Sequence, residues 1–173
     1  MKDGGRMKIG MVWIMFAFYM YALFKIIVLK FSPADAAFLW ERLQYQAARP
    51  EYIAARLQAG NLVPFKEITR AIDTLTVHSL WNLLGNIAIF IPLGLFLGIL
   101  AKPGKLTLAG AVWRSLAVSF GLESAQLLFA VGTFDVDDLI LNSAGGAIGF
   151  IVYALNARLT AAASAYPRGK PVR

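Results

Sequence analysis

The chain has 173 residues, of which 58% are hydrophobic and only 16% are charged, and its mean hydropathy is +0.61. This composition excludes an ordinary soluble domain and indicates an integral membrane protein. The net charge of +7 is spread over loops and chain ends, so no nucleic-acid surface is expected. The chain has no cysteine, which excludes disulfides, and only one histidine. We therefore predict no metal site and no cofactor.

Four segments are long and apolar enough to cross a hydrocarbon core, which takes about 20 helical residues. The first exceeds the roughly 7 to 15 apolar residues of a cleaved signal, so we expect a retained anchor. The predicted fold is an all-α polytopic membrane helical bundle that forms a single domain over 1–173, with a basic cytoplasmic tail at 160–173. The four predicted transmembrane helices cover residues 9–29, 80–101, 106–131 and 138–159.

The orientation of the bundle follows from the positions of lysine and arginine, because basic residues in short loops stay on the cytoplasmic side. Basic residues precede the first helix, occupy the turn "KPGK" at 102–105 and follow the fourth helix. If four helices cross, all three groups fall on one side. Both termini are therefore predicted to be cytoplasmic, and the segment 32–79 and the acidic turn "GTFDVDD" are predicted to face outward.

The outer segment 32–79 is predicted to form short interfacial helices between the first and second membrane helices. Its start, "SPAD" at 32–35, combines a capping serine, a proline at the first helical position and an acid. Arg49-Pro50 should end the first short helix near residue 48, and a second should run over 51–59 before Gly60. The aromatic and apolar residues of this segment suit the headgroup layer.

Polar residues recur at one depth on three of the predicted membrane helices. With about 1.5 Å of rise per residue, they all fall in the outer half of a core roughly 30 Å thick. We therefore predict an outward polar pocket in which these side chains bind a ligand. The predicted binding residues are Asn82, Asn86, Glu123, Gln126, Asp135, Asp138 and Asn142.

Several of these binding residues, and several residues near them in the sequence, also have a purely structural interpretation. Intramembrane amides often join helices at about 0.6 kcal/mol each, Asp137 is expected to cap its helix in water, and His78 is expected to be interfacial. Gly145 and Gly149 form a G-x-x-x-G pair that lets backbones approach. Glu123 differs, because a charge in mid-membrane costs about 2.5 to 3.5 kcal/mol or more and marks a functional site by default.

The chain resembles the VanZ-like membrane proteins of bacteria in four stretches that occur in the family's order. They are "NLVPF" at 61–65, "NLLGNIAIFIPLG" at 82–94, "ESAQ" at 123–126 and "FDVDDLILNSAGGAIGF" at 134–150. Beyond the polar set, the resemblance implies structural motif positions at Asn61, Pro64, Phe65, Gly85, Phe90, Pro92, Gly94, Gly145 and Gly149. Many family members carry an arginine before the F-D pair, where this chain has "VGTFD".

The resemblance implies a multi-pass protein of the bacterial cytoplasmic membrane, in a family whose name is associated with resistance to the glycopeptide teicoplanin. The first hypothesis is an envelope protein whose pocket binds a lipid-linked cell-wall intermediate or a lipoglycopeptide in contact with membrane lipid. The second is an intramembrane enzyme acting on a lipid or cell-wall intermediate, with Glu123 as general acid or base and Asp135 or Asp138 as orienter or metal ligand. The third is a small proton-coupled transporter, against which the absence of an inverted repeat argues. A purely structural scaffold is the fourth, and the sequence does not set the oligomeric state.

Overall fold

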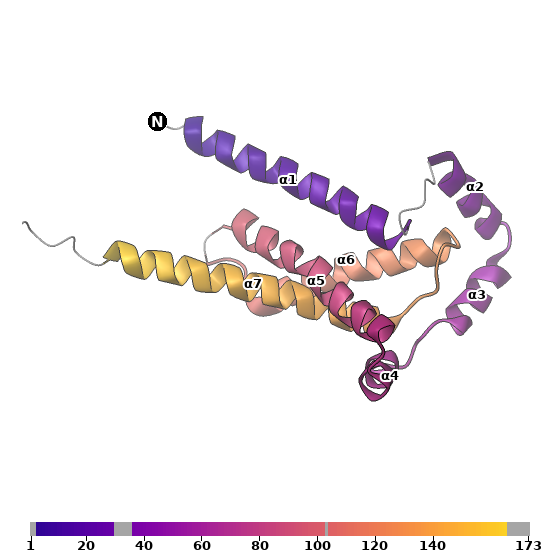
Figure 1. Ribbon diagram of the computed structural model, residues 1–173. Helices are drawn as coiled ribbons and strands as arrows, with labels where there is room; N and C mark the ends of the chain where they lie inside the picture. Colours follow the sequence, from indigo (N-terminus) through magenta and orange to yellow (C-terminus); the bar gives the residue numbers. More distant parts are fainter. Residues whose placement is uncertain (1–2, 30–35, 103, 166–173) are drawn as a thin grey trace, which may run out of the picture.

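The computed structural model describes residues 3–29, 36–102 and 104–165, and these residues form seven helices and no named strand. Four long helices run roughly side by side, and three short ones gather at one end (Figure 1). The prediction of an all-α fold is confirmed for this part of the chain. The helices are α1 (Asp3–Ile27), α2 (Ala36–Ala47), α3 (Pro50–Ala59), α4 (Lys66–Thr74), α5 (Val77–Leu100), α6 (Leu108–Leu128) and α7 (Val136–Ala165).

Three of the described helices are long and apolar enough to cross a membrane, over Ile9–Ile27, Val77–Leu100 and Val136–Ser164. The first of these has a large apolar surface, with Ile14 and Phe18 each 72% exposed. Soluble proteins rarely leave such a continuous apolar face in water. The exposed face of α1 is therefore suited to lipid.

The helix α6 has a lower hydropathy than the other long helices because it carries several polar side chains. Ser115, Ser119, Glu123 and Gln126 are all buried, on the side that packs on α7 and the end of α1. With 21 residues, α6 measures about 31 Å, close to the thickness of a hydrocarbon core. Its length and buried polar stripe are compatible with a fourth crossing.

The helix α7 packs most extensively on α5, because glycines let the two backbones approach. A Cβ atom on Gly145 would lie 2.1 Å from the carbonyl oxygen of Ile87, and one on Gly94 would lie 2.0 Å from that of Gly146. Phe90 and Leu93 are fully buried on α5. Near Pro92, the Tyr19 hydroxyl donates a hydrogen bond of 2.7 Å to the Ile89 carbonyl and ties α1 to α5.

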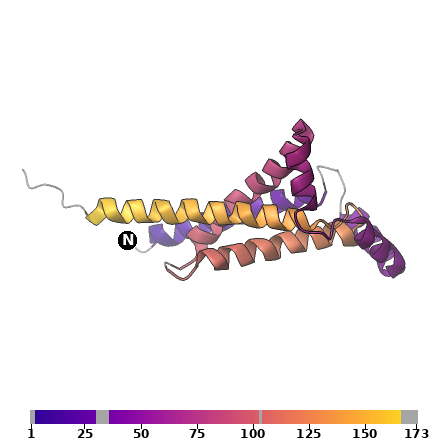
Figure 2. The ribbon, with the colours of Figure 1, turned by 90° about the horizontal axis from the view of Figure 1, so that it is seen from below.

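Some predicted helix boundaries differ from those observed. The helices α2 and α3 occupy the outer segment and are separated at Arg49-Pro50 as expected, whereas the predicted cap at 32–35 lies outside the described residues. The helix α7 continues to Ala165 instead of ending at Leu159, and α4 was not predicted. Figure 2 shows that the start of α1 and the end of α7 lie at the same end of the bundle.

Candidate functional site

The start of α7 is joined to the segment before α4 through Asn61 and Asp135, which form an isolated parallel β-bridge. The Asn61 amide donates to the Phe134 carbonyl at 2.9 Å, and the Val136 amide donates to the Asn61 carbonyl at 2.9 Å. A Cβ atom on Gly60 would lie 2.3 Å from the Phe134 carbonyl oxygen. Gly60 therefore allows a contact that a larger residue would block.

The side chain of Asp135 caps α7 and holds Asn61 at the same time. Its Oδ1 accepts hydrogen bonds from the Asp137 backbone amide at 2.8 Å and from Asn61 Nδ2 at 2.9 Å. A carboxylate that accepts the second amide of a helix satisfies a donor that the helix itself leaves unpaired. The polar start of α7 is thus fixed by local capping and by a residue 74 positions earlier.

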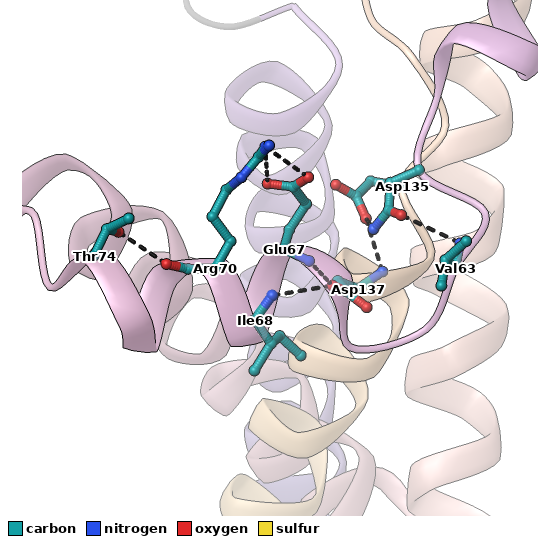
Figure 3. Close-up of polar contacts among 8 residues, drawn as sticks. Val63, Glu67, Ile68, Arg70, Thr74, Asp135 and Asp137 are labelled. Atoms are coloured by element: carbon teal, nitrogen blue, oxygen red, sulfur yellow. Dashed lines mark hydrogen bonds and ion pairs between the residues drawn. The ribbon is translucent and has the colours of Figure 1, made fainter.

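The prediction that Asp137 caps its helix in water was wrong. Its side chain is only 1% exposed, and it caps α4 instead of α7. Oδ1 accepts from the Phe65 amide at 2.5 Å, and Oδ2 accepts from the amides of Glu67 at 2.7 Å and Ile68 at 3.1 Å. Figure 3 shows the carboxylate pointing at the start of α4. Phe65 adopts a positive φ of 67° there, which turns the chain into α4.

A cavity of about 450 Å³ opens between α1, α5, α6 and the start of α7. Its lining includes the apolar side chains of Ile26, Ile27, Trp81 and Ile89 together with the polar side chain of Thr133. Five of the seven predicted binding residues line this cavity: Asn82, Asn86, Gln126, Asp135 and Asp138. We refer to these five residues as the outer cluster.

Two hydrogen bonds hold members of the outer cluster in place. Asn86 Nδ2 donates a short hydrogen bond to Asp138 Oδ1, which joins α5 to α7. Gln126 Nε2 donates to the Ile27 carbonyl at 2.6 Å, which joins α6 to the end of α1. The cavity is therefore lined by side chains that also join four helices in two pairs, α5 to α7 and α6 to α1.

The other two predicted binding residues, Glu123 and Asn142, do not line the cavity. Glu123 is 1% exposed, and its Oε2 accepts the Asp135 backbone amide at 2.9 Å. Asn142 is 2% exposed and donates through Nδ2 to Ser119 Oγ at 2.8 Å. Glu123 thereby supports the loop that carries Asp135, and Asn142 joins α7 to α6.

A second, smaller cavity of about 320 Å³ lies between α4, α5 and α7 and was not predicted. Asn82 and Asp138 line both cavities, and Arg70 and His78 line only this one. Arg70 pairs with Glu67 at 3.1 Å on the exposed face of α4. The helix α4 was missed in the sequence, where the stretch "LVPF" directly before it was the feature that could have indicated a turn.

The chemistry of the larger cavity favours hydroxyl or amino groups. Its lining includes two carboxylates and three amides but no lysine or arginine. Carboxylates accept hydrogen bonds from hydroxyl and ammonium groups, whereas phosphate recognition uses cationic donors. Across the described residues, no group of three or more histidine, cysteine, aspartate or glutamate side chains is arranged to hold a metal ion.

The remaining motif positions form the frame around the cavity. Gly85 lines it, and Pro64 and Phe65 form the exposed entry to α4. Phe90 is fully buried within α5, and Gly94, Gly145 and Gly149 lie where α5 crosses α7. The structure thus brings the N-terminal motif "NLVPF" and the C-terminal motif "FDVDD" together.

Comparison with known proteins identifies sequence relatives of this chain. A family model described as VanZ/LLP1 matches residues 16–157. The chain is 37% identical over 76 residues to "Protein VanZ" of Enterococcus faecium, an alignment that covers 43% of this chain and 45% of that protein. The matched region thus spans less than half the length of that relative. No solved structure matches the chain significantly.

Proposed function

The chain belongs to the VanZ/LLP1 family, and from this premise we propose that it is a bacterial cell-envelope protein whose outer cluster binds a lipid-linked or glycopeptide-type ligand. The observation that carries the proposal is one cavity whose lining combines two carboxylates and three amides with apolar side chains. The carboxylates and amides suit hydroxyl and amino groups of a glycan or glycopeptide. The apolar side chains suit the acyl chain of a ligand that approaches from the membrane.

The proposed topology has four crossings and both termini in the cytoplasm. It is supported by the antiparallel run of α5, α6 and α7 (Figure 1). The basic turn between α5 and α6, which contains Lys102 and Lys105, also supports it. The 30-residue α7 would measure about 45 Å, so it would extend beyond a core about 30 Å thick. In this topology the outer cluster faces away from the cytoplasm.

Single cysteines test this topology, because the chain has none of its own. Thr133 and Lys105 are both exposed and lie at opposite ends of α6. We expect a membrane-impermeant maleimide to label Thr133→Cys on intact cells and to label Lys105→Cys only after permeabilisation. Labelling of Lys105→Cys alone on intact cells would invert the proposed orientation, and labelling of both would exclude the fourth crossing.

The functional role is tested by complementation of a deletion strain. We expect Asp138→Ala to fail to restore teicoplanin susceptibility or envelope integrity to the wild-type level, at normal membrane abundance, because it removes a carboxylate from the cavity lining. Asp73→Ala removes an exposed carboxylate from α4 and serves as the control. Truncation after Tyr166 should be tolerated. Full complementation by Asp138→Ala, or loss of function on truncation, would contradict the proposal.

An intramembrane enzyme remains the second candidate, with Glu123 as general acid or base. A buried carboxyl is the observation in its favour, since burial is how enzymes tune such groups. However, Glu123 does not line the cavity, and one of its oxygens accepts a hydrogen bond from a backbone amide.

Proton-coupled transport, the third candidate, is disfavoured by tight packing below the outer cluster. There, a Cβ atom on Gly146 would lie 1.9 Å from Ser115 Oγ.

A further inference from the structure

A third cavity lies at the opposite end of the bundle from the outer cluster, between α1, α5 and α6. It has a volume of about 310 Å³. Three cationic side chains line it, namely Lys102, Lys105 and Arg114, and none of its lining residues is acidic. We call these three residues the basic cluster.

Arg114 belongs to α6 itself and not to the turn that precedes this helix. It follows the first residue of α6, Leu108, by six positions, which corresponds to about 9 Å along the helix. Its Nη1 donates to the Gly110 carbonyl at 3.0 Å, so the side chain folds back towards the start of α6. A Cβ atom on Gly110 would lie 3.1 Å from that nitrogen, so glycine leaves room for this fold.

The folded-back guanidinium retains most of its hydrogen-bonding capacity. Arginine has five N–H donors in a planar fork that fits phosphate, and the bond to Gly110 uses one of them. Lys102 and Lys105 are exposed and add two positive charges at the same cavity. The basic cluster therefore offers charge and directed donors to a phosphate.

The rest of the cavity is apolar and continues onto a face suited to lipid. The rings of Trp13 and Phe16 on α1 lie edge to face with their centroids 5.9 Å apart. Both residues line the cavity together with Leu97 of α5. Trp13 is 53% exposed. A small soluble anion would use the cations but would leave these walls uncovered, whereas an acyl chain would cover them.

We propose that the basic cluster binds the headgroup phosphate of an acidic phospholipid, with the acyl chain lying along Trp13, Phe16 and Leu97. Basic pockets between membrane helices on the cytoplasmic side are suited to acidic headgroups. The site would hold α1 against the turn between α5 and α6, because all three contribute to its lining. It goes beyond the proposed ligand site and does not depend on which ligand the outer cluster binds.

The full-length protein in phosphatidylcholine nanodiscs, titrated with phosphatidylglycerol and examined by native mass spectrometry, tests this site. We expect phosphatidylglycerol to bind in preference to phosphatidylcholine. Lys102→Gln, Lys105→Gln and Arg114→Gln combined should weaken binding about a hundredfold, at about fivefold for each charge removed. Arg158→Gln, an exposed basic residue at the same end that does not line the cavity, is the control and should leave binding unchanged.

Two further arms keep the result interpretable. Arg114→Lys keeps the charge and should bind more tightly than Arg114→Gln, which separates recognition from loss of fold. Inorganic phosphate should not displace the lipid. Wild-type affinity in the triple variant, equal loss in Arg158→Gln, equal binding of phosphatidylcholine, or displacement by inorganic phosphate would each overturn the proposal.

Discussion

Replacing the buried Asp137 with alanine is expected to release α4 from the bundle and to lower the stability of that end of the molecule strongly. The substitution leaves the amides of Phe65, Glu67 and Ile68 without their shared acceptor. Hydrogen bonds to a charged group contribute about 1.5 to 3 kcal/mol each, although coupled bonds do not add fully. We expect a total loss of about 3 kcal/mol or more.

Hydrogen exchange in detergent or nanodiscs measures this effect at the residues concerned. Exchange at the amides of Phe65, Glu67 and Ile68 should accelerate strongly in Asp137→Ala and less in Asp137→Asn, which keeps one oxygen as an acceptor. Asp73→Ala, also an aspartate substitution but at an exposed position on α4, should leave those amides unchanged. Unchanged exchange in Asp137→Ala would show that the cap does not hold α4.

The second large effect is expected at Glu123, where alanine and glutamine should differ. Alanine removes the acceptor of the Asp135 amide and leaves a void in a fully buried site, at a cost of about 2 to 5 kcal/mol. Glutamine keeps a carbonyl oxygen that can accept the same amide. We therefore expect Glu123→Gln to retain complementing activity and Glu123→Ala to lose it.

Measuring membrane abundance and complementation together for the two variants separates positioning from proton transfer. A positioning residue tolerates glutamine because the hydrogen bond from Asp135 survives. A general acid or base does not tolerate it, because glutamine does not titrate. Loss of activity in Glu123→Gln at normal abundance would therefore favour the enzymatic candidate over the binding protein.

The sequence was sufficient to predict the long apolar helices, and five of the seven polar residues it singled out line one cavity. Hydropathy identifies helices such as α5 directly, because a long apolar run is a local property of the chain. The polar periodicity of α7, from Asp138 to Asn142, likewise predicts which face turns inward. The family resemblance is confirmed by the match over residues 16–157.

Other features depended on contacts between distant residues and could not be read from local pattern. The helix α4 has only nine residues, and its capping carboxylate comes from Asp137, which lies about 70 positions later. Glu123 and Asp138 were both predicted to be binding residues, yet only Asp138 lines the cavity. That difference follows from the loop around Asp135, whose backbone amide donates a hydrogen bond to the Glu123 carboxylate.

The central claim is that the outer cluster is a binding site, and direct binding to the purified protein in nanodiscs tests it most directly. The probes are a fluorescent teicoplanin derivative and a lipid-linked cell-wall disaccharide. We expect wild-type protein and Asp73→Ala to bind at least one probe equally, and Asp138→Ala to bind it about tenfold or more weakly, as expected for the loss of a charge-assisted hydrogen bond. Equal affinity of wild-type protein and Asp138→Ala, or no binding of either probe by wild-type protein, would contradict the claim.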